Sequence, residues 1–353
     1  MLTRRGGDIL DIRERKMKIL YAIIKDYIAT AEPVGSRTLA KKYNLGISPA
    51  TIRNEMADLE EMGFLEQPHT SSGRVPSDKA YRIYVDQLMK VEKINKVIEE
   101  TINKEYESHV GELDKIISQT SKILSNLTNY TSLALTPQLC SASIKHIQLV
   151  PLQEDKILMV IISKEGVVRN VVINIDKKIN SDTLIKISNV LNELIRRSSI
   201  LQFEQEVFDI LNVLNEEERI LLRDIIPIIK DTLSNNDGIK VYTNGITNIF
   251  NFPEFKDLEK AKEFIDLWEQ KNILVQLLSS GTDDGINITI GSENKMDEVR
   301  ECSLITATYQ LNGRTLGTIG VIGPTRMEYS RVVGLLNHLT GQLNELVKRT
   351  LID

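Results

Sequence analysis

Apolar residues in the N-terminal part of the chain recur at helical spacing and predict three helices in close succession. A first helix is indicated by Leu20, Ile23, Ile24, Tyr27 and Ile28, which fall on one face. The turn at 32–35 ends it. A second, short helix is expected over 37–43, with Ser36 as its N-cap. Asn44 and Gly46 then form a tight turn into a third helix over 48–63.

The third predicted helix has well-marked ends and two unlike faces. Ser48 can accept from the free amides of a first turn, Pro49 suits the first helical position, and Gly63 supplies the stop. Its inward face is formed by Ile52, Met56, Leu59 and Met62. Its exposed face begins with Ala50, Thr51, Arg53 and Asn54. Carboxylates fill the second half, namely Glu55, Asp58, Glu60 and Glu61, so only the first half can approach a polyanion.

Two short strands are expected directly after this helix, over 64–66 and around Val75. The tip between them, 67–73, contains small polar residues and His69. Helix, short helix, turn, helix and a two-stranded hairpin is the order of a winged helix-turn-helix. The simpler alternative is an ordinary amphipathic helix followed by a polar loop. Hydroxyls, amides and a guanidinium in and beside the tip, from Thr70, Ser71, Ser72 and Arg74, could lie along phosphates.

The remainder of the chain mixes helices and strands without strict alternation, which predicts an α+β multidomain protein. A helical stripe runs from Tyr81 to Leu127, as one helix or two, and could join the first domain to the rest. Strands are expected at 144–150, 157–163, 167–175, 274–278, 287–290, 303–311 and 315–322. Helices are expected at 181–197, 203–214, 216–233, 258–270 and 329–350, with a loop at 235–238. Asn312-Gly313 predicts a tight hairpin between the last two strands.

Several phrases of this sequence resemble the HrcA family, the repressors of bacterial heat-shock operons. They are the segments 27–36, 48–56, 59–63, 67–76 (QPHTSSGRVP) and 320–329 (GVIGPTRMEY). Because both ends match, the resemblance covers essentially the full length.

The resemblance implies a dimeric repressor that binds double-stranded DNA at an inverted-repeat operator, the CIRCE element, and whose active form is sustained by a chaperonin. It implies a winged helix over 1–90, a GAF-like domain over 91–148 and 240–353, and an inserted dimerising domain over 149–239.

Composition and charge narrow the class of protein. A chain of 353 residues with 41% hydrophobic and 26% charged residues is expected to form two or three globular domains. The longest aliphatic run, 157–162, is too short to span a membrane, and residues 1–20 lack a signal-peptide core. Cys140 and Cys302 give no disulfide framework. We therefore expect a cytoplasmic protein without membrane association.

The net charge of −5 argues against a wholly basic nucleic-acid binder. Residues 1–90 nevertheless hold 15 Lys and Arg against 12 Asp and Glu, so this segment is the more basic one. A basic start is formed by Arg4, Arg5, Arg13, Arg15, Lys16 and Lys18. It can be read equally as a phosphate-facing arm or as a solvated one.

Signatures of catalysis and cofactor binding are missing from the sequence. The glycines at 317, 320 and 323 do not match the dinucleotide fingerprint, and Gly317 and Gly320 are better explained by crowding in a strand. Four histidines, His69, His109, His146 and His338, lie too far apart to suggest metal ligation. We therefore expect that the protein is not an enzyme and that it binds no metal and no cofactor. The open alternatives are a ligand sensor that uses its GAF-like domain, an enzyme with an accessory winged helix, and an architectural DNA binder.

The candidate DNA-binding residues follow from the predicted winged helix. Arg53 is the first choice for reading a guanine, and Asn54 could read an adenine. Ala50 and Thr51 could meet a thymine methyl group or a phosphate, while Arg37 and the tip would hold phosphates. The full set is Arg37, Ser48, Pro49, Ala50, Thr51, Arg53, Asn54, His69, Thr70, Ser71, Ser72 and Arg74.

Overall fold

A computed structural model of the chain describes residues 14–69, 73–107, 113–137, 144–164, 167–175, 179–197, 214–234, 240–279 and 285–352. It is an α+β structure that divides into two compact units. The first unit consists of Met1–Leu135, Val241–Tyr309 and Thr318–Asn344, and the second of Thr136–Lys240, Gln310–Gly317 and Glu345–Asp353.

The first unit begins with a small helical segment, residues 14–88, which we call the head. Its elements are α1 (Glu14–Thr30), α2 (Ser36–Lys42), α3 (Pro49–Glu61), β1 (Leu65–Glu66), β2 (Val75–Pro76), α4 (Asp78–Ile83) and a π-helical turn (Tyr84–Leu88). Strands β1 and β2 pair in antiparallel fashion. The predicted apolar stripes form its core, with Ile23, Leu39, Ile52 and Leu59 fully buried. Met62, expected inside, is 38% exposed because it caps α3 beyond the last turn.

The ends of α3 are those expected from the sequence. Ser48 Oγ accepts from the Thr51 amide at 3.1 Å, and Pro49 is the first helical residue. At the other end Gly63 has a φ of 75°, the left-handed conformation that favours glycine. The Gly63 amide donates to Glu60 and the Phe64 amide to Leu59, both at 2.9 Å. These two bonds close the helix and turn the chain into β1.

The expected capping role of Ser36 is wrong. Gly35 is the N-cap of α2, with an extended backbone, and its carbonyl accepts from the Leu39 amide at 3.1 Å. Ser36 is therefore the first helical residue, and no side chain caps this helix. The helix starts one residue earlier than the serine suggests because Gly35 supplies the first intrahelical acceptor.

The stripe from Tyr81 to Leu127 is not one continuous helix. After the π-helical turn the backbone becomes extended at Met89, and helix resumes only at α5 (Lys96–Glu107) and α6 (Leu113–Thr128). The Asn95 side chain accepts from the Ile98 amide at 2.9 Å and so starts α5 anew. The apolar spacing continued across the break, which is why periodicity alone suggested a longer helix.

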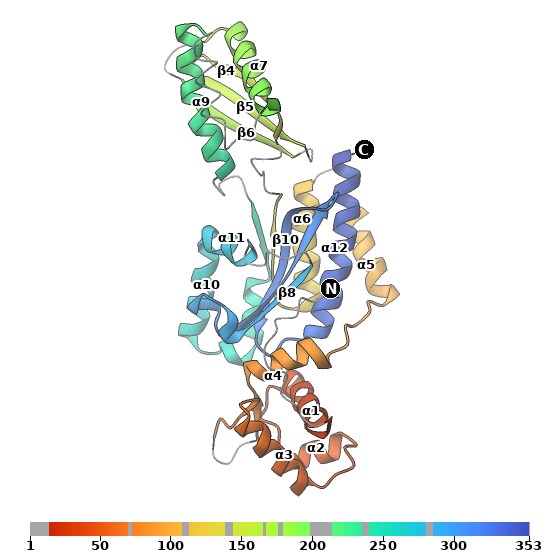
Figure 1. The fold of residues 1–353 in the computed structure, drawn as a ribbon. Coiled ribbons are helices and arrows are strands. Elements are labelled where there is room, and N and C mark those ends of the chain that lie inside the picture. The colour runs from red at the N-terminus through yellow and green to blue at the C-terminus, as the bar shows by residue number, and fades with distance from the viewer. Residues whose placement is uncertain are drawn as a thin grey trace. The chain divides into compact units, whose positions relative to one another are not determined.

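The rest of the first unit is built on a five-stranded sheet, which we call the core. The strand order is β7 (Val241–Asn244), β3 (Thr131–Leu135), β10 (Arg314–Pro324), β9 (Cys302–Leu311) and β8 (Ile286–Ile290). Helices α6 and α12 (Tyr329–Ile352) lie along one side of the sheet, and α10 (Leu258–Glu269) and α11 (Lys271–Ser279) along the other (Figure 1). Among the described residues, 3₁₀ turns lie at Ile246–Asn251, Pro253–Phe255, Gly291–Glu293 and Asp297–Val299.

Most of the predicted elements of the core are confirmed, and one is wrong. Asn312 and Gly313 have φ values of 52° and 76°, as a tight hairpin between β9 and β10 requires. A Cβ at Gly320 would lie 2.9 Å from Leu278 Cδ2, so crowding does explain this glycine. The run 274–278, expected as a strand, lies in α11. A short apolar run has no periodicity that separates a strand from a buried helix. Strands β3 and β7 were not anticipated.

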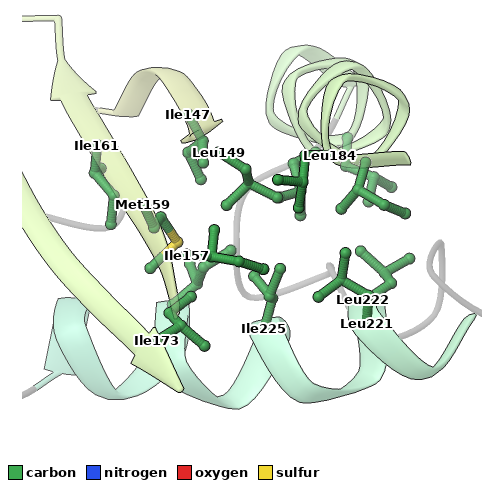
Figure 2. Close-up of a cluster of buried hydrophobic side chains, with 14 of the residues drawn as sticks. Ile147, Leu149, Ile157, Met159, Ile161, Ile173, Leu184, Leu221, Leu222 and Ile225 are labelled. Atoms are coloured by element: carbon green, nitrogen blue, oxygen red, sulfur yellow. The ribbon is translucent and has the colours of Figure 1, made fainter. Parts of the chain in front are cut away.

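The second unit is a three-stranded antiparallel sheet covered on one face by two helices. The sheet order is β4 (Ile144–Gln153), β5 (Lys156–Ser163) and β6 (Val168–Asn174). Figure 2 shows Ile157, Met159 and Ile161 of β5 facing Leu184 of α7 (Ser181–Arg197) and Ile225 of α9 (Glu216–Ser234). These strands and both helices were predicted. The helix expected at 203–214 falls almost wholly, and the loop at 235–238 entirely, outside the described residues.

Candidate nucleic-acid interface

The first turns of α3 present a polar surface to solvent. Pro49, Ala50, Arg53 and Asn54 are exposed, and Thr51 is half-buried. The exposed Ser48 places its Oγ 3.0 Å from Thr51 Oγ1. Within the described parts of the chain, the Arg53 and Asn54 side chains form no hydrogen bond or ion pair. Their donors and acceptors are thus available to an external partner.

The other sequence-predicted residues belong to α2 and to the segment between β1 and β2. Arg37 is exposed on α2, and its guanidinium has no partner among the residues the structure describes. His69 is exposed after β1 and takes part in an interaction within the protein. Thr70, Ser71 and Ser72 lie outside the described residues. Helix α2, which carries Arg37, packs on α3, while the tip remains an expectation.

Arg74 is engaged inside the head. Its Nε donates to Glu60 Oε2 at 2.8 Å, and its side chain is only 19% exposed. Its backbone pairs with that of Val34 through two hydrogen bonds, of 2.9 and 3.0 Å. Gly73 lies so close to Val34 that a Cβ would overlap the backbone there. Arg74 thus fixes β2 to α3, and a phosphate would have to compete with Glu60 for its guanidinium.

Sequence reasoning missed the ion pairs that hold α3 against α1. Glu55 projects from the buried side of α3, and its side chain is only 6% exposed. It accepts from Lys16 Nζ at 2.7 Å and from Arg15, while Lys16 also pairs with Asp58. These contacts lower the pKa of Glu55, with Lys16 as the largest cause against the opposing effect of burial. Pairing with Asp58 and Glu55 raises the pKa of Lys16.

The basic start of the chain is therefore partly used within the head. Arg15 and Lys16 neutralise α3, and Lys18 pairs with Glu14 at 2.8 Å. Arg4, Arg5 and Arg13 lie outside the described residues. A signal for this role was available, because Glu55 shares the helix face of Ile52, Met56 and Leu59 and a buried carboxylate needs a cation.

Other chemistry has little support in the described structure. In the ranges given above, no cluster of three or more His, Cys, Asp or Glu side chains could hold a metal ion. No described helix has the length and apolar character needed to cross a bilayer. Cys302 is a buried free thiol, and burial raises its pKa to about 12. Cys140 and His109 lie outside the described residues.

Comparisons with known proteins identify the family. Residues 114–333 match the family model described as the HrcA protein C-terminal domain. The heat-inducible transcription repressor HrcA of Ruminiclostridium cellulolyticum is 45% identical over 347 residues, which cover 96% of this chain and 98% of that protein. The repressor of the same name from Clostridium tetani is 46% identical over 348 residues, with 97% and 98% covered.

A solved structure shares the fold. The crystal structure of a hypothetical protein at 2.2 Å resolution superimposes with a TM-score of 0.61, at 22% identity, over 96% of this chain and 99% of that one. The sequence matches extend through the head, where α3 exposes Arg53, and through both units. The chain therefore belongs to the HrcA family of heat-inducible transcription repressors.

Proposed function

We propose that this repressor binds an inverted-repeat operator of the CIRCE type as a homodimer, and that each head is a winged helix that reads one half-site. The observation that carries this proposal is the unpaired polar start of α3, with Arg53 and Asn54 exposed, and Arg37 is exposed on the neighbouring helix α2. The other side of α3 is buried and its first turn is capped by Ser48, so the helix can present these side chains in a fixed orientation. Such a surface suits the major groove, where recognition helices insert by their N-terminal residues.

Within this proposal, base reading belongs to Arg53 and Asn54. A guanidinium can bond guanine through two hydrogen bonds, and an amide can do so with adenine. Ala50 and Thr51 would contact a thymine methyl group or a phosphate. Three of the four carboxylates of α3 are paired, because Glu55 and Asp58 pair with α1 and Glu60 pairs with Arg74. The fourth, Glu61, is the last residue of the helix and so lies at the end opposite to Ser48 and Pro49.

Phosphate contacts complete the proposed site. The positive N-terminal end of the α3 dipole, which carries Ser48 and Pro49, favours an anion there. Arg37 supplies a free guanidinium on α2. The segment between β1 and β2, which would form the wing, would contribute further phosphate contacts from His69, Thr70, Ser71, Ser72 and Arg74. These contacts position the head and carry no sequence information.

The second unit offers a surface that could pair two chains. Val150, Leu158 and Val172 lie opposite one another on the three strands of the sheet. Ile157 and Ile173, which are adjacent in sequence to Leu158 and Val172, are buried against the helices. Because successive residues of a strand point to opposite faces, Val150, Leu158 and Val172 lie on the face of the sheet that the helices do not cover. Val150 is 40% and Val172 is 53% exposed. An apolar sheet face of this kind is typical of an interface, and it supports the dimerising role that we propose for an inserted domain over 149–239. The proposal includes a GAF-like domain over 91–148 and 240–353, into which this domain is inserted.

The experiment that tests the proposal compares labelled duplexes in a gel shift at fixed salt. The duplexes are an intact CIRCE-type inverted repeat, one half-site alone, and a scrambled sequence of equal composition. We expect the inverted repeat to bind at least about 10³-fold more tightly than scrambled DNA, with the half-site in between. Equal binding to all three would favour an architectural binder. No binding to any of them would refute the DNA-reading role and reopen the ligand-sensor interpretation.

We further propose that a chaperonin maintains the DNA-competent dimer by returning aggregation-prone conformers to the active pool. The structure has two compact units and exposed apolar side chains, among them Phe250 at 49% and Leu258 at 81% exposed. Multidomain chains of marginal stability escape from the native state by such routes. Warming the purified protein should reduce operator binding with time, and chaperonin with ATP should restore it. Affinity that stays constant on heating, or that chaperonin does not restore, would reject this mechanism.

A further inference from the structure

The head is joined to the core of the first unit by polar contacts that involve two arginines far from α3. We call this set of contacts the seam. It consists of Arg82 and Asp78 on α4, Arg326 after β10, and the groups that they bind. None of these side chains belongs to the proposed DNA-reading surface, so their role requires a separate explanation.

Arg82 attaches α4 to the edge strand of the core sheet. Its Nε donates to Glu293 Oε1 at 2.8 Å, and one terminal nitrogen donates to the Ile288 carbonyl of β8 at 2.7 Å. That same nitrogen also pairs with Glu293, so the contact is bidentate. Burial acts to lower the pKa of Arg82, but pairing with Glu293 and Asp86 outweighs it, and the pKa is raised. The guanidinium is thus a fixed cation that satisfies both a carboxylate and a strand-edge carbonyl.

Arg326 attaches the core to the last turn of α1. Its Nε pairs with Glu254, and a terminal nitrogen lies 3.3 Å from the second carboxylate oxygen. Its other terminal nitrogen donates to the Ile28 carbonyl at 3.1 Å. The guanidinium also lies 5.6 Å from the centre of the Phe252 ring, and the side chain is only 12% exposed. One rigid, planar group therefore links three segments.

Close packing reinforces the two arginines. The Asp78 carboxylate accepts from the Ser292 amide at 2.8 Å, and a Cβ at Gly291 would overlap that carboxylate. Tyr81 and Tyr84 of the head lie 5.9 and 6.4 Å, ring centre to ring centre, from Tyr329 of the core. Bidentate ion pairs, and close packing against a glycine that leaves no room for a Cβ, tolerate little displacement. The contacts of the seam therefore fit one placement of the head on the core.

We propose that Arg82 and Arg326 are positioning residues that fix the head on the core and so determine which spacing between operator half-sites the repressor accepts. This inference rests on the proposed function, because it needs two heads on an inverted repeat. Two recognition helices reach the same face of B-DNA only when their half-sites lie a suitable distance apart. A head on a loose tether would follow its half-site to many spacings, whereas a fixed head would not.

The test measures binding to operators whose central spacer is lengthened or shortened by one to five base pairs. Full-length wild type is compared with Arg82→Met, Arg326→Met and Arg326→Lys. Wild type should lose at least about tenfold in affinity when the spacer changes by half a helical turn. In the two Met variants this loss should shrink to about threefold or less, while binding to a single half-site stays unchanged. Arg326→Lys keeps the charge without the planar fork and should give an intermediate profile.

Controls separate positioning from folding. Arg331→Met is the matched variant, because Arg331 donates to the Leu127 carbonyl within the core at 2.9 Å and has no hydrogen bond or ion pair with the described residues of the head. Arg331→Met should keep the wild-type spacing profile. If the Met variants fail to fold by circular dichroism, Glu254→Gln and Glu293→Gln take their place and should loosen the spacing preference in the same way.

Three results would overturn the inference. The seam variants could retain the wild-type profile, or they could bind the native operator more tightly, which would make the seam an inhibitory clamp. Wild type could also bind all spacings equally, which would show that the heads are not fixed by the seam. A wild type that does not bind the inverted repeat at all would instead refute the proposed function, so the two failures are distinguishable.

Discussion

Lys16 Nζ on α1 lies 2.7 Å from Glu55 Oε2 on α3. The Glu55 side chain is 6% exposed, so α3 contains a charge on the side that it buries, and α1 supplies the cations that compensate it. A buried carboxylate is costly unless it is paired. The pair therefore holds α3 in place and leaves the opposite, exposed side of the helix free for an external partner.

The first prediction concerns the pH dependence of stability at Glu55. Because its pKa is lowered in the folded state, the pairing stabilises the protein above the ordinary value of 4.5 and is lost as the pH falls through the folded-state value. Glu55→Gln should lower the free energy of unfolding by about 1–3 kcal/mol at pH 7. The deficit should narrow as the pH falls below 4.5 and through the folded-state pKa, as measured by urea denaturation.

A matched control for Glu55 lies on the same helix. Glu61 is exposed and has no side-chain partner among the described residues. Glu61→Gln should leave the free energy of unfolding within about 0.5 kcal/mol of wild type at both pH values. Equal deficits in the two variants, or a Glu55→Gln deficit that does not change with pH, would contradict the structural role of the buried pair.

The second prediction concerns base reading. Arg53→Ala should cost about 1–3 kcal/mol per half-site and relax the preference at one base pair, because the lost contact is specific for one base. Affinity should be measured against a panel of operators with single base-pair changes. Arg219, an exposed arginine on α9 in the second unit, provides the control. The assignment fails if Arg53→Ala weakens specific and random DNA alike.

The third prediction separates two roles of Arg74. If it contacts a phosphate, Arg74→Ala should weaken binding to all DNA and flatten the slope of log affinity against log salt by about one unit. Glu60→Gln, which releases the guanidinium from its partner, should then leave binding unchanged or strengthen it. If Arg74 only fixes β2 to α3, both variants should weaken operator binding and neither should change the salt slope.

The fold was predictable where local chemistry decides it. Ser48 and Gly63 mark the ends of α3 through bonds to residues three to five positions away, and Asn312-Gly313 specifies its hairpin through two positive φ values. The run 274–278 was mistaken for a strand because nothing local distinguishes a buried helix from a buried strand of that length. In the structure Leu278 of this run lies against Gly320 of β10, a contact across 42 positions that the sequence does not reveal.

The candidate site was predictable only in part, for a related reason. The exposed side of α3 follows from helical spacing, which places Arg53 and Asn54 away from Ile52 and Leu59. The partners of Glu55 lie 39 and 40 positions away, and the Ile28 carbonyl lies 298 positions from Arg326. Contacts of that range depend on the tertiary fold, so a single sequence gives the charge that needs a partner but not the partner.

The last prediction concerns the apolar sheet face of the second unit. Val172 on β6 is 53% exposed and lies opposite Leu158, whose other neighbour across the sheet is Val150. If two chains pair through this face, Val172→Lys would bury an unpaired ammonium group in the interface. The variant should be a monomer at micromolar concentration by light scattering, and its affinity for the inverted repeat should fall by about 10² or more. Its binding to a single half-site should not change.

Ile220 offers a control of equal exposure on a different surface. It is 56% exposed on α9, which packs on the opposite face of the same sheet. Ile220→Lys adds the same charge at a similar cost to the monomer, so it should remain dimeric and bind the operator as wild type does. If Val172→Lys stays dimeric while Ile220→Lys dissociates, the chains pair through the helices. If both variants remain dimeric with wild-type operator affinity, the second unit does not form the interface and the dimerising role belongs to the first unit.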